Sequence, residues 1–397
     1  MPNMDHNILV IAERTPQYDG GSGDQKILYT SYYQMPNVHF CIINDKAQDK
    51  HYIDNPYEYI DLHENNDEPD NKWRYAGFVK SFSMKQDKFL QSGNIIGQIV
   101  DKVNEIIAKK NIQILLFEQT GFLMWSWYRY FSDKVQCILR VHDSHYHNLR
   151  LDIQTRDNIM SKIALFGSAI TQKRHEKRHI HRWDQVQFLS QKEYQYYCDE
   201  YPEINDKFSY TPPSIFVLQN EYRSDTEKNI DLLFVGTMNW KPNSDAVKWF
   251  LSAVLPLIKL EIPNVEVKII GKNATQKINC QDENVEVIGF VESLDEIYQS
   301  TKLALNPSIS GGGIRVKLME YAAFGLPIIT TRQGVSGFRN DIENYLVVKD
   351  TPEHFAAAVV HLLGDHNLRE AYRLKVYEYA QSKFDYKENQ KAWAKEM

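Results

Sequence analysis

The fold class is decided by residues 306–325, NPSISGGGIRVKLMEYAAFG. Residues 303–306 are typical of a short strand, and residues 307–313 of a turn. Residues 314–324 have helical composition, and Gly325 is a typical residue to end such a helix. Three consecutive glycines let a backbone approach a ligand closely, and a helix start offers free N–H groups. The segment therefore predicts a strand–turn–helix unit that binds phosphate.

The side chains after the glycines favour the same kind of site. At about 100° per residue, Lys317 and Glu320 lie one turn apart on the helix face that continues from Gly313. The ammonium would neutralise phosphate, and the carboxylate would accept hydrogen bonds from sugar or ribose hydroxyls. Arg315 points away on an ideal helix, although its long side chain can bend back in the first turn. A solvated Lys–Glu pair after an ordinary loop is the competing interpretation.

Short apolar runs alternate with amphipathic stretches on both sides of residue 220. The first half contains four predicted buried strands, at residues 7–12, 38–43, 112–117 and 137–141. The second half contains six, at residues 231–235, 265–270, 285–288, 303–306, 327–330 and 345–348. Strands that alternate with helices form parallel sheets covered on both faces. The sequence therefore predicts an α/β protein of two doubly wound, Rossmann-like domains.

The domain boundaries follow from length and composition. A chain of 397 residues exceeds one ordinary hydrophobic core. Residues 211–229 contain Pro212 and Pro213 and continue to a polar, charged run, which is typical of a linker. We predict domains at residues 1–210 and 230–378 and a closing segment at residues 379–397. Because open parallel sheets bind ligands at the carboxyl ends of their strands, two facing domains define a cleft.

Composition argues against several classes of protein. A net charge of −6 disfavours a dedicated nucleic-acid binder. The four cysteines are scattered without a CxxC pair, which excludes common zinc spacings and favours a reducing cytosol. We find no secretory signal and no run approaching the ~20 apolar residues of a membrane span. We expect a cytoplasmic protein that is soluble or sits at a membrane surface.

Two segments resemble a known family. One is residues 311–338, GGGIRVKLMEYAAFGLPIITTRQGVSGF, which is similar to the donor-site signature of the retaining glycosyltransferase family 4 with the GT-B fold. The other is residues 232–250, LLFVGTMNWKPNSDAVKWF, which is similar to the start of the C-terminal domain in bacterial polysaccharide enzymes of that family. Their spacing also fits, and residues 7–23 add weaker support. The resemblance implies sugar transfer from a nucleotide-sugar donor to a glycan, lipid-linked or protein-linked acceptor, with retention, in bacterial surface polysaccharide or glycoconjugate synthesis.

The resemblance also assigns roles to residues. Glu320 matches the second glutamate of a paired motif, which usually holds the ribose hydroxyls. The first glutamate of that motif falls on Gly312 or Gly313, so a carboxylate contact to the sugar is lost or replaced by backbone N–H groups. After Gly236 the family often has arginine, and this chain has Thr237. The phosphate charge must then fall on Lys317, Arg315 or Lys241.

The implied donor-binding residues come from both halves of the chain. Gly21 belongs to a glycine loop that is a weak dinucleotide signal alone but resembles the family loop facing the donor phosphates. Phe290 belongs to a run similar to the segment that flanks the nucleotide base. The full set is Gly21, Gly236, Asn239, Lys241, Phe290, Gly311, Gly312, Gly313, Ile314, Arg315 and Lys317.

A histidine-rich run, residues 140–149 (RVHDSHYHNL), follows a predicted strand. Histidine and aspartate ligate metals, but no cysteine pair or carboxylate cluster stands at a matching spacing, and no Asp-x-Asp motif ends a strand. We therefore expect no metal and no cofactor beyond the donor substrate. His142 best matches the family histidine that contacts the donor sugar near its anomeric carbon, and with Glu320 it is a candidate catalytic residue. A plain cap at the strand end is the other interpretation.

Three further segments carry partner predictions. The basic run at residues 172–182 is either a solvated helix face or a contact with anionic lipid headgroups or a lipid-pyrophosphate acceptor. The aromatic run at residues 122–131 is typical of core, with a sugar or membrane surface as the alternative. Residues 384–393 resemble the closing helix of the family, which packs back on the N-terminal domain.

Other functions remain open at this stage. The missing glutamate and arginine are compatible with an inactive glycosyltransferase-like partner subunit, and a nucleotide-sugar epimerase also uses a two-domain cleft. A nicotinamide oxidoreductase is disfavoured because the full dinucleotide fingerprint is absent. The sequence does not distinguish UDP, GDP and dTDP donors, nor does it fix the sugar or the acceptor.

Overall fold

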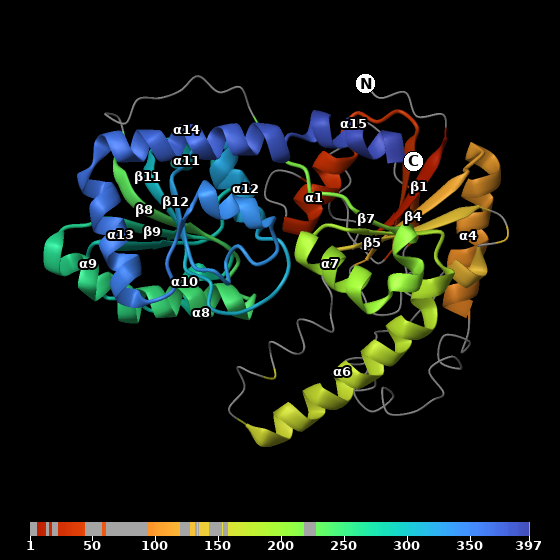
Figure 1. The fold of residues 1–397 in the computed structure, drawn as a ribbon, viewed down its shortest axis with the longest axis horizontal. Coiled ribbons are helices and arrows are strands. Elements are labelled where there is room, and N and C mark those ends of the chain that lie inside the picture. Colours follow the sequence, from red (N-terminus) through yellow and green to blue (C-terminus); the bar gives the residue numbers. More distant parts are fainter. Residues whose placement is uncertain are drawn as a thin grey trace. The chain divides into compact units, whose positions relative to one another are not determined.

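The protein is described here by a computed structural model. The described residues are 6–12, 16–17, 23–43, 58–60, 94–119, 128–131, 133, 135–142, 153, 158–217 and 228–396. The chain divides into two compact units (Figure 1). The first comprises residues 1–16, 34–211 and 393–397, and the second comprises residues 17–33 and 212–392.

The first unit is built on a seven-stranded parallel sheet with the order β3-β2-β1-β4-β5-β6-β7. The strands are β1 (Ile8–Ala12), β2 (Val38–Ile43), β3 (Glu58–Ile60), β4 (Ile114–Gln119), β5 (Gln136–Val141), β6 (Gln185–Phe188) and β7 (Phe208–Tyr210). The helices include α4 (Asn94–Lys110), α6 (Ile159–His179) and α7 (Gln191–Glu200). Strands β1, β4 and β5 are almost wholly buried, which explains their continuous apolar runs.

The second unit is built on a six-stranded parallel sheet with the order β10-β9-β8-β11-β12-β13. Its strands are β8 (Ile230–Val235), β9 (Val267–Ile270), β10 (Val285–Ile288), β11 (Thr301–Asn306), β12 (Ile328–Thr330) and β13 (Val347–Val348). Its helices are α1 (Gly23–Ser31), α8 (Lys241–Trp249), α9 (Leu255–Glu261), α10 (Ala274–Lys277), α11 (Asp295–Gln299), α12 (Val316–Ala323), α13 (Pro352–Gly364), α14 (His366–Lys383) and most of α15 (Tyr386–Glu396).

The sheet of the second unit separates two apolar clusters. Side chains alternate along β8, so that Leu232 and Phe234 join a cluster with α8, α9 and α13, while Leu233 joins a cluster with α12 and α14. Helices therefore cover both faces of a parallel sheet. Both units are Rossmann-like, which confirms the predicted architecture.

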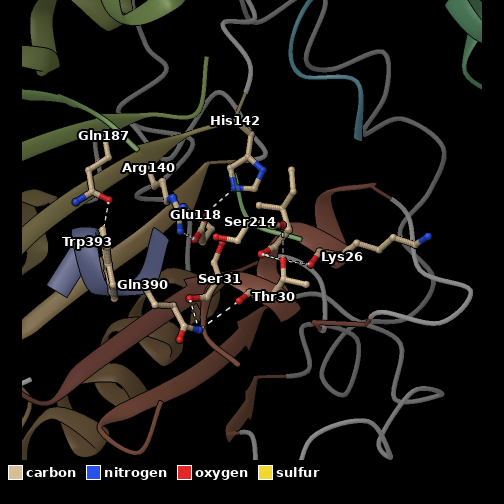
Figure 2. Close-up of polar contacts among 11 residues, drawn as sticks. Lys26, Thr30, Ser31, Glu118, Arg140, His142, Gln187, Ser214, Gln390 and Trp393 are labelled. Carbon is tan, nitrogen blue, oxygen red and sulfur yellow. Dashed lines mark hydrogen bonds and ion pairs between the residues drawn. The ribbon is translucent and has the colours of Figure 1, made fainter. Parts of the chain in front are cut away.

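Two helices differ from the predicted division of the chain. Helix α1, which the sequence placed in the first domain, belongs to the second unit. A Cβ added at Gly23 would lie 3.0 Å from the side chain of Val316, so α1 begins in close contact with α12. Helix α15 is divided at residue 392. Figure 2 shows Gln390 donating to the carbonyls of Thr30 and Ser31 at the end of α1.

None of the helices in the described residues is both long enough and apolar enough to cross a membrane.

Candidate functional site

The glycine turn lies between β11 and α12, at the carboxyl end of the sheet in the second unit. Gly311 and Gly313 have φ angles of 83° and 74°, which L side chains rarely adopt. A Cβ at Gly311 would also lie 2.8 Å from the ring of Pro242. Helix α12 begins at Val316, two residues later than predicted, and Gly325 ends it with a positive φ of 66°. Two of the three glycines are therefore required by the backbone of the turn itself.

Arg315 is the residue immediately before α12, and its side chain bends back onto the turn. Its guanidinium donates to the carbonyls of Ser310 at 3.0 Å and Gly311 at 2.7 Å, and also to that of Gly312. The guanidinium lies 4.9 Å from the ring centroid of Trp240. Because these donors bind carbonyls of the turn, the arrangement favours a positioning role for Arg315, which holds the turn in shape.

Lys317 lies in the first turn of α12 and is 9% exposed. Its Nζ donates to Oδ1 of Asn243 at 2.8 Å and lies 3.9 Å from the ring centroid of Phe234. Burial and, secondarily, the Arg315 guanidinium lower the pKa of Lys317 well below its ordinary value, and Glu320 opposes this only in part. A desolvated ammonium next to the N-terminal end of a helix gains most from a bound anion. This is the chemistry of a phosphate site.

Gly236 follows β8 and leaves the space in which Lys317 sits. A Cβ there would lie 2.6 Å from Nδ2 of Asn243 and 2.9 Å from Nζ of Lys317. The Asn243 Nδ2 in turn donates to the Thr237 carbonyl at 3.0 Å. The structure therefore brings together three predicted elements, which are Gly236, the glycine turn and Lys317. It adds Asn243, which the sequence did not single out.

Glu320 lies one turn further along α12 and is 8% exposed. It forms an ion pair with Lys26 of α1 and accepts a hydrogen bond from the Tyr298 hydroxyl at 3.4 Å. The carboxylate is held in place by these two contacts, and ribose hydroxyls could bind it in place of the ammonium. Neither Lys26 nor Tyr298 was predicted, since nothing in the local sequence connects them to Glu320.

The other predicted donor residues are less enclosed. Asn239 is exposed, and Lys241 is exposed and forms an ion pair with Asp245 one turn later in α8. Phe290 follows β10 and is 58% exposed. Ile314 is partly buried, and Gly21 lies outside the described residues.

His142 follows β5 at the carboxyl end of the first sheet, beside a buried carboxylate. Figure 2 shows Glu118 of β4 between the side chains of Arg140 and His142. Glu118 is fully buried, and its Oε1 lies 3.4 Å from Nη1 of Arg140 while its Oε2 bonds Nε2 of His142. Because a carboxylate accepts hydrogen bonds, a neutral imidazole bonded to it through Nε2 carries its proton on Nε2. Nδ1 is then the acceptor nitrogen. Glu118 thus orients the predicted histidine.

Glu118 was missed by the sequence analysis, although a signal existed. It is the one charged residue in the buried strand ILLFEQ of β4, and strand register pairs it with Arg140. A carboxylate near the end of an apolar strand is costly to bury without a partner and therefore indicates a specific role. The rest of the histidine run, residues 143–149, lies outside the described residues.

The basic and aromatic runs are placed in part. Residues 172–179 belong to α6, where Gln172, Glu176 and His179 are buried, so this stretch is not uniformly solvated. Tyr128 and Phe131 are buried in the core of the first unit, while residues 122–127 lie outside the described residues.

Part of the chain matches known protein sequences. Residues 229–365, which include the glycine turn and α12, match the family model "Glycosyl transferases group 1". An uncharacterized 44.6 kDa protein in the cps region of Klebsiella pneumoniae is 23% identical over 263 residues. That match covers 63% of this chain and 65% of the relative.

Solved structures match over almost the whole chain. Sucrose-phosphate synthase from Thermosynechococcus elongatus has a TM-score of 0.70 at 13% identity, covering 98% of both chains. Anabaena HepE, solved with UDP and glucose, has a TM-score of 0.64 at 11% identity, again covering 98% of both chains. The pneumococcal O-GlcNAc transferase GtfA, solved with UDP and GlcNAc, has a TM-score of 0.61 at 13% identity and the same coverage. These matches show that the chain has the GT-B fold.

Proposed function

We propose that the protein is a retaining glycosyltransferase of family 4 type, which transfers a sugar from a nucleotide-sugar donor to a glycan, lipid-linked or protein-linked acceptor. The observation that carries the proposal is the buried ammonium of Lys317, held by Asn243 at the N-terminal end of α12 behind a glycine turn. The family match covers this segment. The relative encoded in a cps region supports a role in bacterial surface polysaccharide synthesis.

In this proposal the second unit binds the donor diphosphate. Negative charge develops on the phosphate when the bond to the anomeric carbon breaks, and fixed positive groups stabilise that charge. Lys317 and the N–H groups at the start of α12 supply this stabilisation without a metal ion. Arg315 keeps the turn in place through the carbonyls that it binds.

The remaining predicted residues act on the sugar and the ribose. Glu320 binds the ribose hydroxyls after its ion pair with Lys26 opens. His142, oriented by Glu118, accepts a hydrogen bond at Nδ1 from a hydroxyl of the donor sugar near its anomeric carbon. Phe290 flanks the base, and its exposed ring is available to stack on it.

Thermal melting with UDP, GDP, dTDP and their sugars tests the proposal. A ligand that binds only the folded state at one hundred times its Kd stabilises it by ~2.7 kcal/mol, so one nucleotide should raise Tm clearly above the others. Hydrolysis of the matching nucleotide sugar should follow, and NMR of the first-formed anomer should show retention. No shift with any of these ligands would refute the nucleotide-sugar proposal, and an inverted product would refute retention.

A second candidate is an inactive glycosyltransferase-like subunit, which Gly312 and Gly313 motivate because they occupy the place of the first glutamate. Such a protein would bind a nucleotide sugar but would neither hydrolyse nor transfer it. Epimer formation without an acceptor would instead indicate a nucleotide-sugar epimerase.

A further inference from the structure

Helix α6 (Ile159–His179) buries one of its faces, as judged from the described residues of the first unit. Its buried residues recur at three- and four-residue spacing, at Ala169, Gln172, Glu176 and His179. The Tyr128 hydroxyl lies 3.2 Å from Nδ1 of His179 and anchors the C-terminal end of the helix. Figure 1 shows that α6 lies near the sheet of the first unit at its C-terminal end and extends away from that sheet at its N-terminal end. The N-terminal half therefore projects from the body of the unit.

The opposite face of α6 is apolar and exposed. Five of the ten large apolar side chains that are exposed among the described residues belong to this helix, namely Ile159, Met160, Ile163, Phe166 and Ile170. On an ideal helix, Ile163, Phe166 and Ile170 fall within about 60° of one another and roughly opposite the buried face. Ile163 is 61% exposed and Phe166 is 60% exposed. A contiguous exposed stripe of this kind marks an interaction surface.

The same face continues into a cluster of cations. Arg174, Lys177 and Arg178 are all exposed and extend the line of the apolar stripe toward the C-terminal end of α6. The helix contains five lysines and arginines and one carboxylate, Glu176, which is buried and lies 3.4 Å from Nζ of Lys173. This positive face belongs to a chain of net charge −6. Its charge is therefore local and complementary to an anionic surface.

A second copy of the chain fits this face poorly. Two α6 helices paired in parallel along their full length would bring cations against cations, and an antiparallel pair would bring cations against the apolar stripe. Anionic lipid offers both required environments, because acyl chains accept the apolar side chains while phosphates accept the cations.

We propose that α6 docks the protein on an anionic lipid bilayer, with Ile163 and Phe166 entering the acyl boundary. Arg174, Lys177 and Arg178 meet the phosphate groups further along the same helix. Phe166 and Lys177 are separated by about 16 Å along the axis at ~1.5 Å per residue, so the helix lies along the surface. The basic run seen in the sequence supplies only half of this surface, and the apolar stripe supplies the rest.

Co-sedimentation of the full-length protein with vesicles tests the proposal. The protein should bind vesicles of 70% phosphatidylcholine and 30% phosphatidylglycerol and bind pure phosphatidylcholine at least tenfold more weakly. It should dissociate in 0.5 M NaCl, where the Debye length is about 4 Å. Each cation near the surface contributes about fivefold to binding, so the triple change Arg174→Gln, Lys177→Gln, Arg178→Gln should weaken it about 100-fold. The double change Ile163→Gln, Phe166→Gln should also weaken it at least tenfold.

Matched variants in the second unit control for surface apolarity and for charge. The double change Leu260→Gln, Leu374→Gln removes two apolar side chains that are 77% and 57% exposed, and the triple change Lys248→Gln, Lys277→Gln, Lys375→Gln removes three exposed cations. Both should bind vesicles like the unchanged protein. All variants should keep their Tm, because the altered side chains are exposed.

Three results would overturn the proposal. One is the absence of vesicle binding, and another is binding that α6 variants and control variants reduce equally. The third is a dimer in sedimentation velocity that only the α6 variants dissociate, which would assign the stripe to self-association. Vesicle binding is measured without donor or acceptor, so its failure is separate from a failure of the transfer reaction.

Discussion

Replacing Lys317 with methionine distinguishes between two roles of this lysine, which are binding phosphate and stabilising the fold. Methionine keeps most of the length and volume of the side chain in the space between Asn243 and Phe234, but it removes the ammonium. If the lysine serves mainly to stabilise the fold, the variant should be less stable. If it serves to bind phosphate, the variant should fold well and lose the ligand.

The contacts of Lys317 set the expected changes in Kd and in the free energy of unfolding. A hydrogen bond to a charged group contributes ~1.5–3 kcal/mol, so loss of the bond from Lys317 to a donor phosphate should raise Kd by about 10-fold to 150-fold. The free energy of unfolding without ligand should stay constant or rise by about 1 kcal/mol, because a desolvated ammonium leaves while only the bond to Asn243 is lost.

The pH dependence provides a second readout with a defined sign. Burial lowers the pKa of Lys317 in the folded state below its ordinary value of 10.5, so the unfolded chain binds more protons between that lowered pKa and 10.5. The free energy of unfolding contributed by this group therefore rises with pH across that window. The rise should be absent in Lys317→Met.

Isothermal titration with the nucleoside diphosphate that stabilises the wild-type protein most is the appropriate assay, combined with denaturant unfolding at several pH values. Lys248→Met, which changes an exposed lysine of α8, is the control and should bind normally. A Kd for Lys317→Met within twofold of wild type, or a loss of several kcal/mol of stability, would refute the phosphate-binding role.

Three further substitutions test the rest of the site. Gly236→Ala places a methyl group 2.9 Å from Nζ of Lys317 and should weaken diphosphate binding about tenfold or more by calorimetry, whereas an unchanged Kd would mean that the lysine does not contact the ligand. Glu320→Gln should raise the KM for the donor about tenfold in a transfer assay. If the substitution raises the KM equally for nucleotide sugars that lack the ribose hydroxyls, Glu320 does not bind the ribose. Glu118→Gln should lower kcat about tenfold or more through misorientation of His142 while the donor KM changes less than threefold, and a change confined to KM would contradict the positioning role.

The strands were predictable because burial on both faces of a parallel sheet leaves a plain signature. The predicted strand at residues 7–12 corresponds to β1 (Ile8–Ala12), and the one at 38–43 corresponds to β2 (Val38–Ile43). Helix starts were less predictable. Residues Ile314 and Arg315 have helical composition, but the side chain of Arg315 binds carbonyls of the turn, and α12 begins only at Val316.

The site was predictable where its residues are neighbours in sequence. Lys317, Glu320 and the glycine turn lie within ten residues, so helical spacing places them correctly relative to one another. Their partners come from distant segments. Asn243 is 74 residues from Lys317, and Lys26 is 294 residues from Glu320, so only the tertiary structure brings each pair together.

The contact between Glu118 and His142 depends on strand register and could not be predicted from the sequence. Glu118 and His142 are 24 residues apart and meet because β4 and β5 are parallel neighbours paired in register. The exposure of the apolar stripe on α6 could not be predicted either, since its apolar spacing resembles that of any helix packed on a core. Only the structure shows that this stripe faces outward.

The central claim is that the glycine turn and Lys317 bind the diphosphate of a sugar donor. A crystal structure with the nucleoside diphosphate selected by thermal melting tests it most directly. We predict a phosphate oxygen about 3 Å from Nζ of Lys317, with further oxygens facing the N–H groups of the turn and the start of α12. A diphosphate bound elsewhere, with Nζ of Lys317 still directed only to Asn243, would contradict the claim.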